Sequence, residues 1–376
     1  MSAHMTDVDV IVIGAGMAGA SVAYFLAPHA RVLVLEREAW AGMHSTGRSA
    51  ALFSETYGSP QVRALTRATR PFLATPPQGF AAQPILGPRG ATIIGGAAHT
   101  DDVRALYEAI VPFSRDIELH DAVRLQAAVP VLRPEFAQIG LHEPGAADID
   151  VNELHQGFLR GLRARGGELR LNVAIRAISP TGGGWEVDDG EQGCRAPLLL
   201  NAAGAWVDQI ATLAGVAPLG IKPKRRSAFV FDPPEGIATA RWPFLTDFAE
   251  TFYFKPDAGL LLGSCANADP VEPHDVQPEE YDIALGIHRI EEATTMTIRR
   301  PRRTWAGLRS FVADGDLVGG FAQDAPGFFW VAAQGGYGIQ TSAAMGEVCA
   351  HLALGLPLPA QLVDAGLSAA LLAPRG

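Results

Sequence analysis

The sequence predicts an α/β protein that begins with a strand, a glycine-rich turn, a helix and a second strand. The apolar run 9–13 leads directly into the turn Gly14-Ala-Gly16-Met-Ala-Gly19, and a second apolar run, 32–35, ends at Glu36. Residues 197–206 repeat the pattern of a buried strand followed by a turn of small residues. Turn signals and a hairpin pattern interrupt these segments, so we expect a second domain inserted into the first.

The glycine-rich turn predicts a dinucleotide-binding site. In a turn of this spacing, Gly14 bends the chain, Gly16 lets the backbone approach a pyrophosphate, and Gly19 lets the helix pack closely on the strand. Free amides at the start of the helix would face the diphosphate. Glu36 follows the second strand, where a carboxylate accepts hydrogen bonds from an adenosine ribose. The flanking strands and this acid disfavour an ordinary glycine-rich turn, but the turn alone does not distinguish NAD from FAD.

Composition indicates an ordinary globular enzyme. The chain has 376 residues, of which 48% are hydrophobic and 19% charged, and a net charge of −10 disfavours nucleic acid as a partner. The basic clusters at 222–226 and 299–303 are typical of solvated faces. Three cysteines without metal-ligand spacing indicate a reducing compartment, with no bound metal and no structural disulfide.

The ends and apolar runs of the chain give no sign of export or of membrane insertion. The first strand begins too early to leave room for a signal peptide. No uncharged run approaches the roughly 20 residues that span a bilayer. We therefore expect a cytoplasmic protein without a transmembrane segment, and the sequence leaves peripheral contact with the inner membrane open.

Periodicity and turn signals place further elements along the chain. We expect helices at 61–72, 101–109 and 121–129, and a strand at 91–94 that enters the second domain. A helix at 151–165 would bury one apolar face, formed by Leu154, Phe158, Leu159 and Leu162. Strands are expected at 169–173 and 185–187. The apolar run 328–331 leads to the glycine-rich segment 335–338, and a helix begins near 341–342.

Residues 222–304 form a second insertion into the nucleotide-binding domain. This insertion contains a hairpin at 251–263 around the turn 256–259. In its first arm Tyr253 faces away from Phe252 and Phe254, because side chains alternate along a strand. These signals predict a discontinuous nucleotide-binding domain, 1–84, 145–221 and 305–376, and a substrate domain, 85–144 and 222–304.

Four sequence runs carry a resemblance to a known family. They are 44–51 (HSTGRSAA), 224–229 (KRRSAF), 305–311 (WAGLRSF) and 333–342 (AQGGYGIQTS). With these runs in order, nearly the whole chain resembles the D-amino-acid oxidase superfamily of FAD enzymes, and within it D-arginine dehydrogenase. The resemblance implies FAD as the cofactor, a Rossmann-like FAD-binding domain, and a substrate domain with a mixed, largely antiparallel sheet.

The turn and the resemblance together indicate which positions contact FAD. The loop 42–51 is rich in small and polar residues, which suits backbone pressed against a flat ligand, although a solvated loop would look the same. The helix after Gly338 would direct its amides at the flavin and stabilise negative charge there. Cys349 lies inside that helix, so we expect FAD to be non-covalent. The predicted cofactor residues are Gly14, Ala15, Gly16, Met17, Ala18, Gly19, Glu36, Arg37, His44, Ser45, Thr46, Arg48, Ser49, Ala50, Ala51, Val173, Ala203, Gly204, Trp206, Arg309, Gly335, Gly336, Tyr337, Gly338, Ile339 and Gln340.

The resemblance also assigns residues to the substrate. Arg226 and Arg309 would bind its carboxylate through their planar forks of donors, and the Tyr253 hydroxyl would add a hydrogen bond. The alternative for Arg226 is a surface basic cluster. The Tyr57 hydroxyl and the Gly336 carbonyl would lie near the neutral amine. The implied reaction is hydride transfer from Cα to flavin N5, giving an imino acid that water hydrolyses to a 2-oxo acid and ammonia.

Departures from the family pattern bear on the side chain of the substrate. Members selective for cationic side chains carry a glutamate at the position of Ala91 and a histidine at that of Leu52. A guanidinium buried without a carboxylate is costly, so we expect apolar or aromatic D-amino acids to be favoured over D-arginine. Glu55 would restore an acidic contact if its loop folds inward. The predicted pocket residues are Leu52, Phe53, Ser54, Ala91, Phe244 and Thr246.

Several functions fit these observations. The leading hypothesis is a D-amino-acid dehydrogenase that passes electrons to a quinone-like acceptor. The alternative enzyme is an oxidase that uses oxygen on glycine, sarcosine or a related amine acid. A non-catalytic flavin carrier is disfavoured by the pair Arg226 and Arg309 with Tyr253, and an NAD-dependent dehydrogenase by the resemblance.

Overall fold

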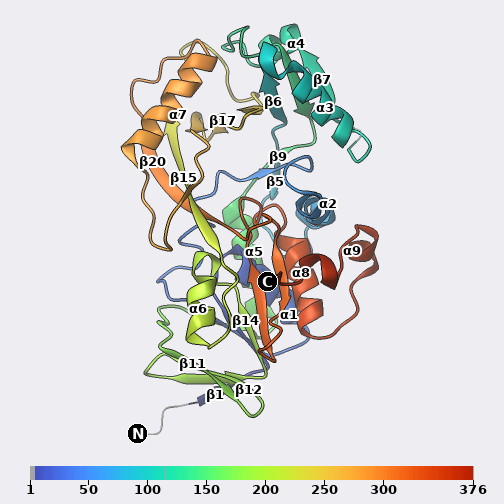
Figure 1. Cartoon of the computed structure of the whole chain (residues 1–376), viewed down its shortest axis with the longest axis vertical. Coiled ribbons are helices and arrows are strands. Elements are labelled where there is room, and N and C mark those ends of the chain that lie inside the picture. Colours follow the sequence, from blue (N-terminus) through green and yellow to red (C-terminus); the bar gives the residue numbers. More distant parts are fainter. Residues whose placement is uncertain (1–4, 115, 376) are drawn as a thin grey trace.

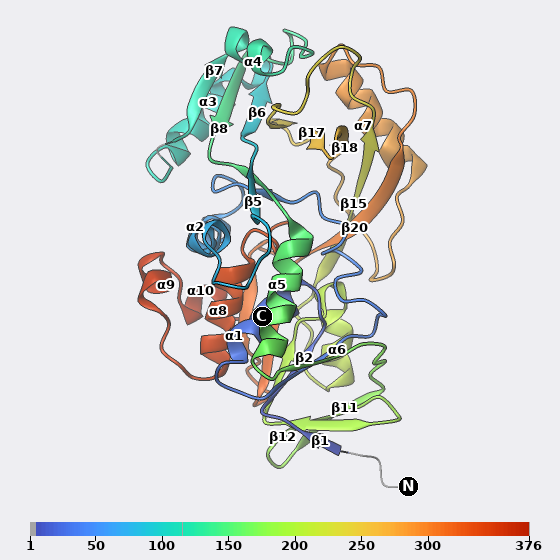
Figure 2. The ribbon, with the colours of Figure 1, turned by 180° about the vertical axis from the view of Figure 1, so that it is seen from behind.

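The structure, a computed structural model, describes residues 5–114 and 116–375. Residues 1–4, at the start of the predicted nucleotide-binding domain, lie outside the described residues. Two lobes are built on a six-stranded and a nine-stranded sheet, and the long strands β15 (Lys222–Phe231) and β20 (Arg303–Phe311) run from one lobe to the other (Figures 1 and 2). The predicted α/β class with mixed sheets is confirmed.

The six-stranded sheet contains the predicted strand, turn, helix and strand. Five neighbouring strands are parallel, and the last, β21, is antiparallel to β22. In spatial order the strands are β10 (Glu168–Arg170), β3 (Val32–Leu35), β2 (Val10–Ile13), β14 (Leu198–Asn201), β22 (Phe328–Ala332) and β21 (Val318–Phe321). The repeated strand predicted near 197–206 is therefore β14, directly beside β2.

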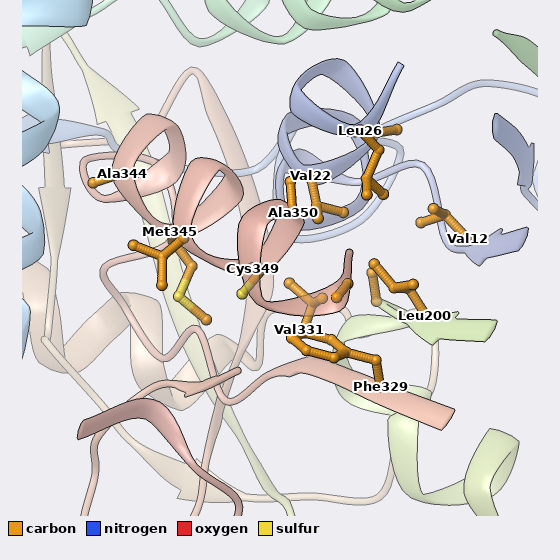
Figure 3. Packing of buried hydrophobic residues seen from close by; sticks show 14 of the residues in the cluster. Val12, Val22, Leu26, Leu200, Phe329, Val331, Ala344, Met345, Cys349 and Ala350 are labelled. Carbon is orange, nitrogen blue, oxygen red and sulfur yellow. The ribbon is translucent and has the colours of Figure 1, made fainter. Parts of the chain in front are cut away.

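Both faces of this sheet are buried, as is typical of parallel sheets. Val12 and Leu200 pack under α1 (Met17–Leu26) and α8 (Ser342–Ala353), which Figure 3 shows from close by. Ile11 and Leu199 point the other way, toward α6 (Val207–Leu213) and a four-stranded sheet. That sheet contains β1 (Met5–Asp7), β13 (Gly193–Ala196), β12 (Gly184–Asp188) and β11 (Ala177–Thr181).

The remaining elements of this lobe follow the sequence closely. Helix α2 (Pro60–Ala74) begins after Ser59, whose side chain accepts a hydrogen bond from the Val62 amide, and α5 (Val151–Ala164) begins after the capping residue Asp150. The predicted apolar face of α5 is buried. Strand β10 ends earlier than predicted because Asn172, at φ 60°, turns the chain. The other short elements are η2 (Gly204–Trp206), α9 (Ala360–Asp364) and α10 (Ala369–Leu372).

The nine-stranded sheet forms the second lobe. Beside β15 and β20 it contains β19 (Asp269–Pro270), β18 (Leu260–Ser264), β17 (Tyr253–Asp257), β16 (Phe244–Asp247), β6 (Ala91–Gly95), β8 (Ile139–Glu143) and β7 (Glu118–Asp121). Helices α7 (Glu280–Ala293) and α4 (Ala122–Ala128) cover one face, and η1 (Ala97–His99) and α3 (Thr100–Ile110) lie at the β6 and β8 end. Phe252 and Phe254 face α7, whereas Tyr253 points to the opposite side, as predicted.

The predicted hairpin is formed by β17 and β18. Ala258 and Gly259, at its tip, have φ angles of 46° and 83°. Two residues with positive φ are what a two-residue type I′ turn requires. The hairpin directs Tyr253 toward the other lobe.

A three-stranded sheet lies between the lobes and contains β4 (Leu52–Phe53), β9 (Ala147–Ile149) and β5 (Leu86–Pro88). The predicted division into domains stays a prediction. Strand β20 runs across its 304/305 boundary and pairs with β15 along its whole length. Within residues 5–114 and 116–375, no helix is both long enough and apolar enough to cross a membrane.

Candidate functional site

A single cavity of about 490 Å³ joins the predicted cofactor site to the predicted substrate site. Its lining includes Glu36, Val173 and Trp206 of the predicted cofactor site and Arg226 and Arg309 of the predicted substrate site. The glycine-rich turn, the loop 42–50 and the glycine-rich segment before α8 line it as well. Its size is typical of pockets for small molecules and cofactors.

The glycine-rich turn has the geometry that its sequence predicts. Gly14 has φ 99°, and a Cβ built on it would lie 2.6 Å from the Ala202 carbonyl oxygen. A Cβ on Gly19 would lie 1.8 Å from the Gly14 carbonyl oxygen, so neither position accepts a side chain. Gly16 instead has its open side toward the cavity, where the nearest atom to such a Cβ is the Thr46 hydroxyl at 3.4 Å.

The start of α1 offers free donors to the cavity. Among the described residues, no hydrogen bond occupies the amides of Gly16 and Ala18, both of which line the cavity. The amide between them, of Met17, donates to the Thr46 hydroxyl at 2.9 Å. Free amides at the start of a ten-residue helix attract a phosphate group.

Glu36 stands where a ribose is expected. One of its carboxylate oxygens accepts from the Ala15 amide at 2.8 Å and the other from the Glu38 amide at 3.0 Å. Each oxygen keeps a lone pair for a further donor. At the same end of the cavity, the Arg37 guanidinium lies 4.1 Å from the ring centroid of Trp206 and closes the pocket with an aromatic and a cationic surface.

The loop 42–51 is fastened to β20 and to the segment 275–276. Its Ser45 hydroxyl donates to the Leu308 carbonyl at 2.7 Å, and the Arg48 guanidinium donates to the Val276 carbonyl at 2.9 Å and forms an ion pair with Asp275. These contacts favour the ligand-facing interpretation of the loop over a solvated one.

Arg226 and Arg309 come from neighbouring strands and share one face of the sheet. In the register of β15 and β20, Arg309 lies opposite Lys224, two residues from Arg226. Such diagonal neighbours lie about 7–8 Å apart on the same face. The Nε of Arg226 donates to the Asn267 carbonyl at 2.6 Å, which leaves its terminal nitrogens free to bind a ligand.

The neighbouring arginine, Arg225, does not belong to this site. This residue points to the other side of the sheet, where it pairs with Asp282 at 3.0 Å and with Glu279. Among the described residues, no carboxylate lies within 4.0 Å of Arg226 or Arg309. The cavity therefore contains two cations without counter-ions, which favours an anionic ligand group.

Tyrosines surround the two arginines. Burial and the like charge of Arg309 lower the pKa of Arg226. Burial also acts to lower the pKa of Arg309. The nearby hydroxyls of Tyr57 and Tyr253 outweigh this effect, so the pKa of Arg309 is raised overall. Burial raises the pKa of Tyr337 to about 12, so this phenol stays neutral. Both arginines remain charged across the physiological range.

Gly336 lies against one of these guanidinium groups. A Cβ built on it would lie 3.0 Å from the Cζ of Arg309. The adjacent Gly335 amide donates to the Ser310 carbonyl at 2.9 Å, which ties this segment to β20. The glycine-rich segment therefore approaches the arginine closely because it has no side chain there.

The structure brings most of the predicted residues together, but not all of them. Of the predicted catalytic residues, Arg226, Arg309, Tyr253 and Gly336 line the cavity, and Tyr57 lies beside it with its ring 5.2 Å from that of Tyr337. The described cofactor candidates that do not line it are Ala15, Gly19, Ala51, Tyr337 and Gln340. Cavity-lining residues that the sequence did not single out are Ile13, Leu35, Gly42, Met43, Ala174, Ile175, Ala202, Ala205, Gln209, Ile210, Leu213, Ala228, Gly307, Leu308, Ser310, Ala333 and Gln334.

None of the six residues predicted for the side-chain pocket lines the cavity itself, and they divide into two groups. Ala91, Phe244 and Thr246 share a face with Tyr253 through the pairing of β6, β16 and β17, and the Phe244 ring stacks on Tyr253 at 5.3 Å. Phe53 instead is fully buried and packs in the core with α1 and α5, so it offers no surface to a substrate.

The loop 52–58 supplies the other predicted pocket residues. Leu52 and Ser54 flank the core residue Phe53, and Leu52 remains half-buried. The sequence did not tell whether Glu55 turns toward the substrate. In the structure it pairs with Arg70 of α2. Glu143, on β8, was not predicted, and it accepts a hydrogen bond from the Ser54 hydroxyl at 2.6 Å.

The cysteines lie away from the cavity. Cys349 is fully buried between α8 and the six-stranded sheet, as Figure 3 shows. Cys194 and Cys265 are buried as well, and none of the three lines the cavity. A thioether link from a cysteine to a ligand in this cavity therefore has no candidate among them.

Comparison with known proteins gives a consistent picture. A family model described as DAO, FAD dependent oxidoreductase, matches residues 9–352. The "FAD-dependent oxidoreductase domain-containing protein 1" of Bos taurus is 24% identical over 400 residues, covering 92% of this chain and 81% of the relative.

Solved structures share the fold over almost the whole chain. Glycine oxidase from Geobacillus kaustophilus superposes with a TM-score of 0.85 at 19% identity, covering 98% of this chain and 99% of the other. L-proline dehydrogenase from P. horikoshii gives 0.80 at 18% identity, covering 94% and 96%. At such identities the likeness concerns the fold alone.

Proposed function

The chain belongs to the DAO family of FAD-dependent oxidoreductases, and from this premise we propose that it oxidatively deaminates D-amino acids with apolar or aromatic side chains. One observation carries the proposal. The cavity that contains the dinucleotide turn also contains two arginines that pair with no carboxylate of the described residues, and these arginines suit the carboxylate of an amino acid. A flavin carrier without a substrate would have no need of such a pair.

The residues of the cavity fit FAD. The open side of Gly16 and the free amides of Gly16 and Ala18 suit the diphosphate, and Glu36 suits the ribose. Gly336 and Gly338 would hold the flavin end beside the start of α8. When bound, FAD supplies an acceptor for the two electrons and the hydrogen that leave the substrate Cα.

The protein side chains would orient the substrate. Arg226 and Arg309 bind the carboxylate in two places, and the Tyr253 hydroxyl donates a further hydrogen bond. The Gly336 carbonyl and the Tyr57 hydroxyl receive the amine, which must be neutral for its lone pair to form the C=N bond as the Cα hydrogen departs. Water then hydrolyses the imino acid to a 2-oxo acid and ammonia. Holding the substrate by both its carboxylate and its amine orients it for the reaction and so lowers the barrier.

The preference for D-substrates is proposed from the sequence resemblance and not from the fold. The superposed L-proline dehydrogenase shows that the same fold accompanies an enzyme named for an L-substrate. Once the carboxylate and the amine are fixed, only one enantiomer directs its Cα hydrogen at the flavin ring. The motifs around Arg226 and Arg309 favour the D-enantiomer.

An apolar pocket is supported by the residues near Tyr253. Ala91 and Phe244 present apolar surface on this face of the sheet. The buried carboxylate of Glu143, opposite Ala91, has its oxygens occupied by three donors of the loop 54–56. A guanidinium side chain would therefore not find this acid free.

The test of this function is a product assay on purified holoenzyme. D-phenylalanine and D-leucine are expected to yield the 2-oxo acid and ammonia with dye reduction exceeding peroxide release, as for a dehydrogenase with a quinone-like acceptor. The structural likeness to glycine oxidase favours one alternative, an oxidase of glycine, sarcosine or a related amine acid. Peroxide equal to the substrate oxidised, with glycine or sarcosine as the best substrate, would establish that alternative.

Ala91→Glu should shift the substrate preference. A carboxylate at position 91 would face the substrate side chain, so the ratio of kcat/KM for D-arginine to that for D-phenylalanine should rise about tenfold or more, the gain of one charge-assisted hydrogen bond. Ala91→Gln introduces a side chain of the same size as glutamate but without its charge, and it serves as the control. In this variant the ratio should change by less than about threefold. An equal rise in both variants would contradict the charge argument.

A further inference from the structure

Glu143 is a buried acid in the same row of the sheet as the predicted side-chain pocket. It lies directly opposite Ala91 in the pairing of β8 with β6, and Ala91 in turn pairs with Phe244 of β16. Partners of this kind direct their side chains to one face of a sheet. The Glu143 side chain is only 3% exposed, and among the described residues no cation lies within 4.0 Å of it.

Three consecutive residues of one loop satisfy this carboxylate. The Ser54 hydroxyl donates to it at 2.6 Å, the Glu55 amide at 2.8 Å and the Thr56 hydroxyl at 2.7 Å. A buried carboxylate without a cation depends on such donors, because the loss of its hydration is otherwise uncompensated. The carboxylate and the loop therefore hold each other in place across two separate parts of the chain.

The next residue of that loop is Tyr57. Its ring packs on Tyr337, and its hydroxyl lies close enough to the Arg309 guanidinium to raise the pKa of that group. On the other side of the loop, Gln340 accepts from the Ser54 amide at 3.3 Å and donates to the Ser54 carbonyl at 3.4 Å. The loop therefore lies between β8 and the segment before α8, and Tyr57 directly follows the three residues that donate to Glu143.

We infer that Glu143 is a positioning residue of the substrate site, fixing the loop 54–56 so that the Tyr57 hydroxyl stays beside Arg309. The catalytic meaning of this role rests on the proposed function, whereas the anchoring of the loop does not. Glu143 itself touches neither Arg226 nor Arg309 and acts only through the loop.

Hydrogen exchange on the holoenzyme tests the anchoring without any substrate. Glu143→Leu introduces an apolar side chain of similar size that has no acceptor, so amide exchange in a peptide covering 52–58 should accelerate at least about tenfold. Glu143→Gln is the matched control. Its amide oxygen still accepts from the Glu55 amide and its NH2 group donates to the two hydroxyls, so exchange should stay within about threefold of wild type. Unchanged exchange in Glu143→Leu would overturn the inference.

A double-mutant cycle with Tyr57→Phe tests the link to the site. Glu143→Leu alone should raise the KM for the D-amino acid about tenfold, and in the Tyr57→Phe background by less than about twofold, because the hydroxyl that it positions is already gone. Additive effects would overturn the positioning role. If Glu143→Leu does not fold, Thr56→Val removes one of the three contacts from the loop side and should accelerate exchange about threefold. A wild-type enzyme that turns over no amino acid would refute the proposed function, and accelerated exchange would still support the anchor.

Discussion

Arg309→Met is expected to lower kcat/KM for the amino-acid substrate about 100- to 1,000-fold, mainly through KM, because a bidentate pair of charge-assisted hydrogen bonds is lost. The guanidinium lies against Gly336 and beside Tyr57, in a place where no carboxylate of the described chain neutralises it. Methionine keeps the length of the side chain but none of its donors. Steady-state kinetics with the FAD content of each preparation would measure the effect.

The matched control is Arg303→Met, the same substitution on the same strand. Arg303 lies at the exposed end of β20, over the ring of Trp305. Its removal should change KM by less than about twofold. An Arg309→Met enzyme with the KM of wild type and full FAD content would contradict the role of the arginine pair.

Gly19→Ala should abolish tight binding of FAD. The new Cβ would lie 1.8 Å from the Gly14 carbonyl oxygen, a backbone atom inside the turn that cannot move without displacing the free amides. A clash this close with a backbone atom lies at the upper end of the roughly 1–3 kcal/mol that overpacking costs, so the Kd for FAD should rise about 100-fold, which corresponds to about 2.7 kcal/mol. The ratio of flavin to protein after purification, and titration of the apoprotein with FAD, would measure it.

Gly182→Ala is the control for this change. A Cβ at Gly182 meets no atom within 4 Å, and its φ is not in the left-handed region. The variant should keep wild-type FAD content. Stoichiometric FAD in Gly19→Ala would show that the turn tolerates a side chain and that the close packing does not matter for the cofactor.

Local signals predicted the elements that depend on neighbouring residues. The glycine turn depends on the positive φ of Gly14 and on the contact of Gly19 with the Gly14 carbonyl, and the β17–β18 hairpin depends on the positive φ angles of Ala258 and Gly259. The capping residue Asp150 likewise accepts from Glu153, three residues further on, and starts the predicted helix. Such features can be predicted from the sequence because each depends on few residues.

Features that depend on the pairing of distant strands were not predicted from local sequence. In the run Lys224-Arg225-Arg226, the sequence does not tell which arginine faces the cavity, and only the register with β20 separates Arg226 from the ion-paired Arg225. The role of Glu143 depends on its contact with a loop almost ninety positions away, |i−j| 87–89. Phe53 was predicted to line the pocket, but strand alternation directs it into the core and leaves Leu52 on the other side.

The central claim is that Arg226 and Arg309 hold an amino acid so that one enantiomer presents its Cα hydrogen to the flavin. Anaerobic rapid mixing of the holoenzyme with D-phenylalanine or L-phenylalanine, followed by the loss of flavin absorbance, tests it most directly. D-phenylalanine should reduce the flavin more than about 100-fold faster than L-phenylalanine, because misplacing the reacting atom by about 1 Å slows a reaction by about that factor. Equal or faster reduction by L-phenylalanine would contradict the account.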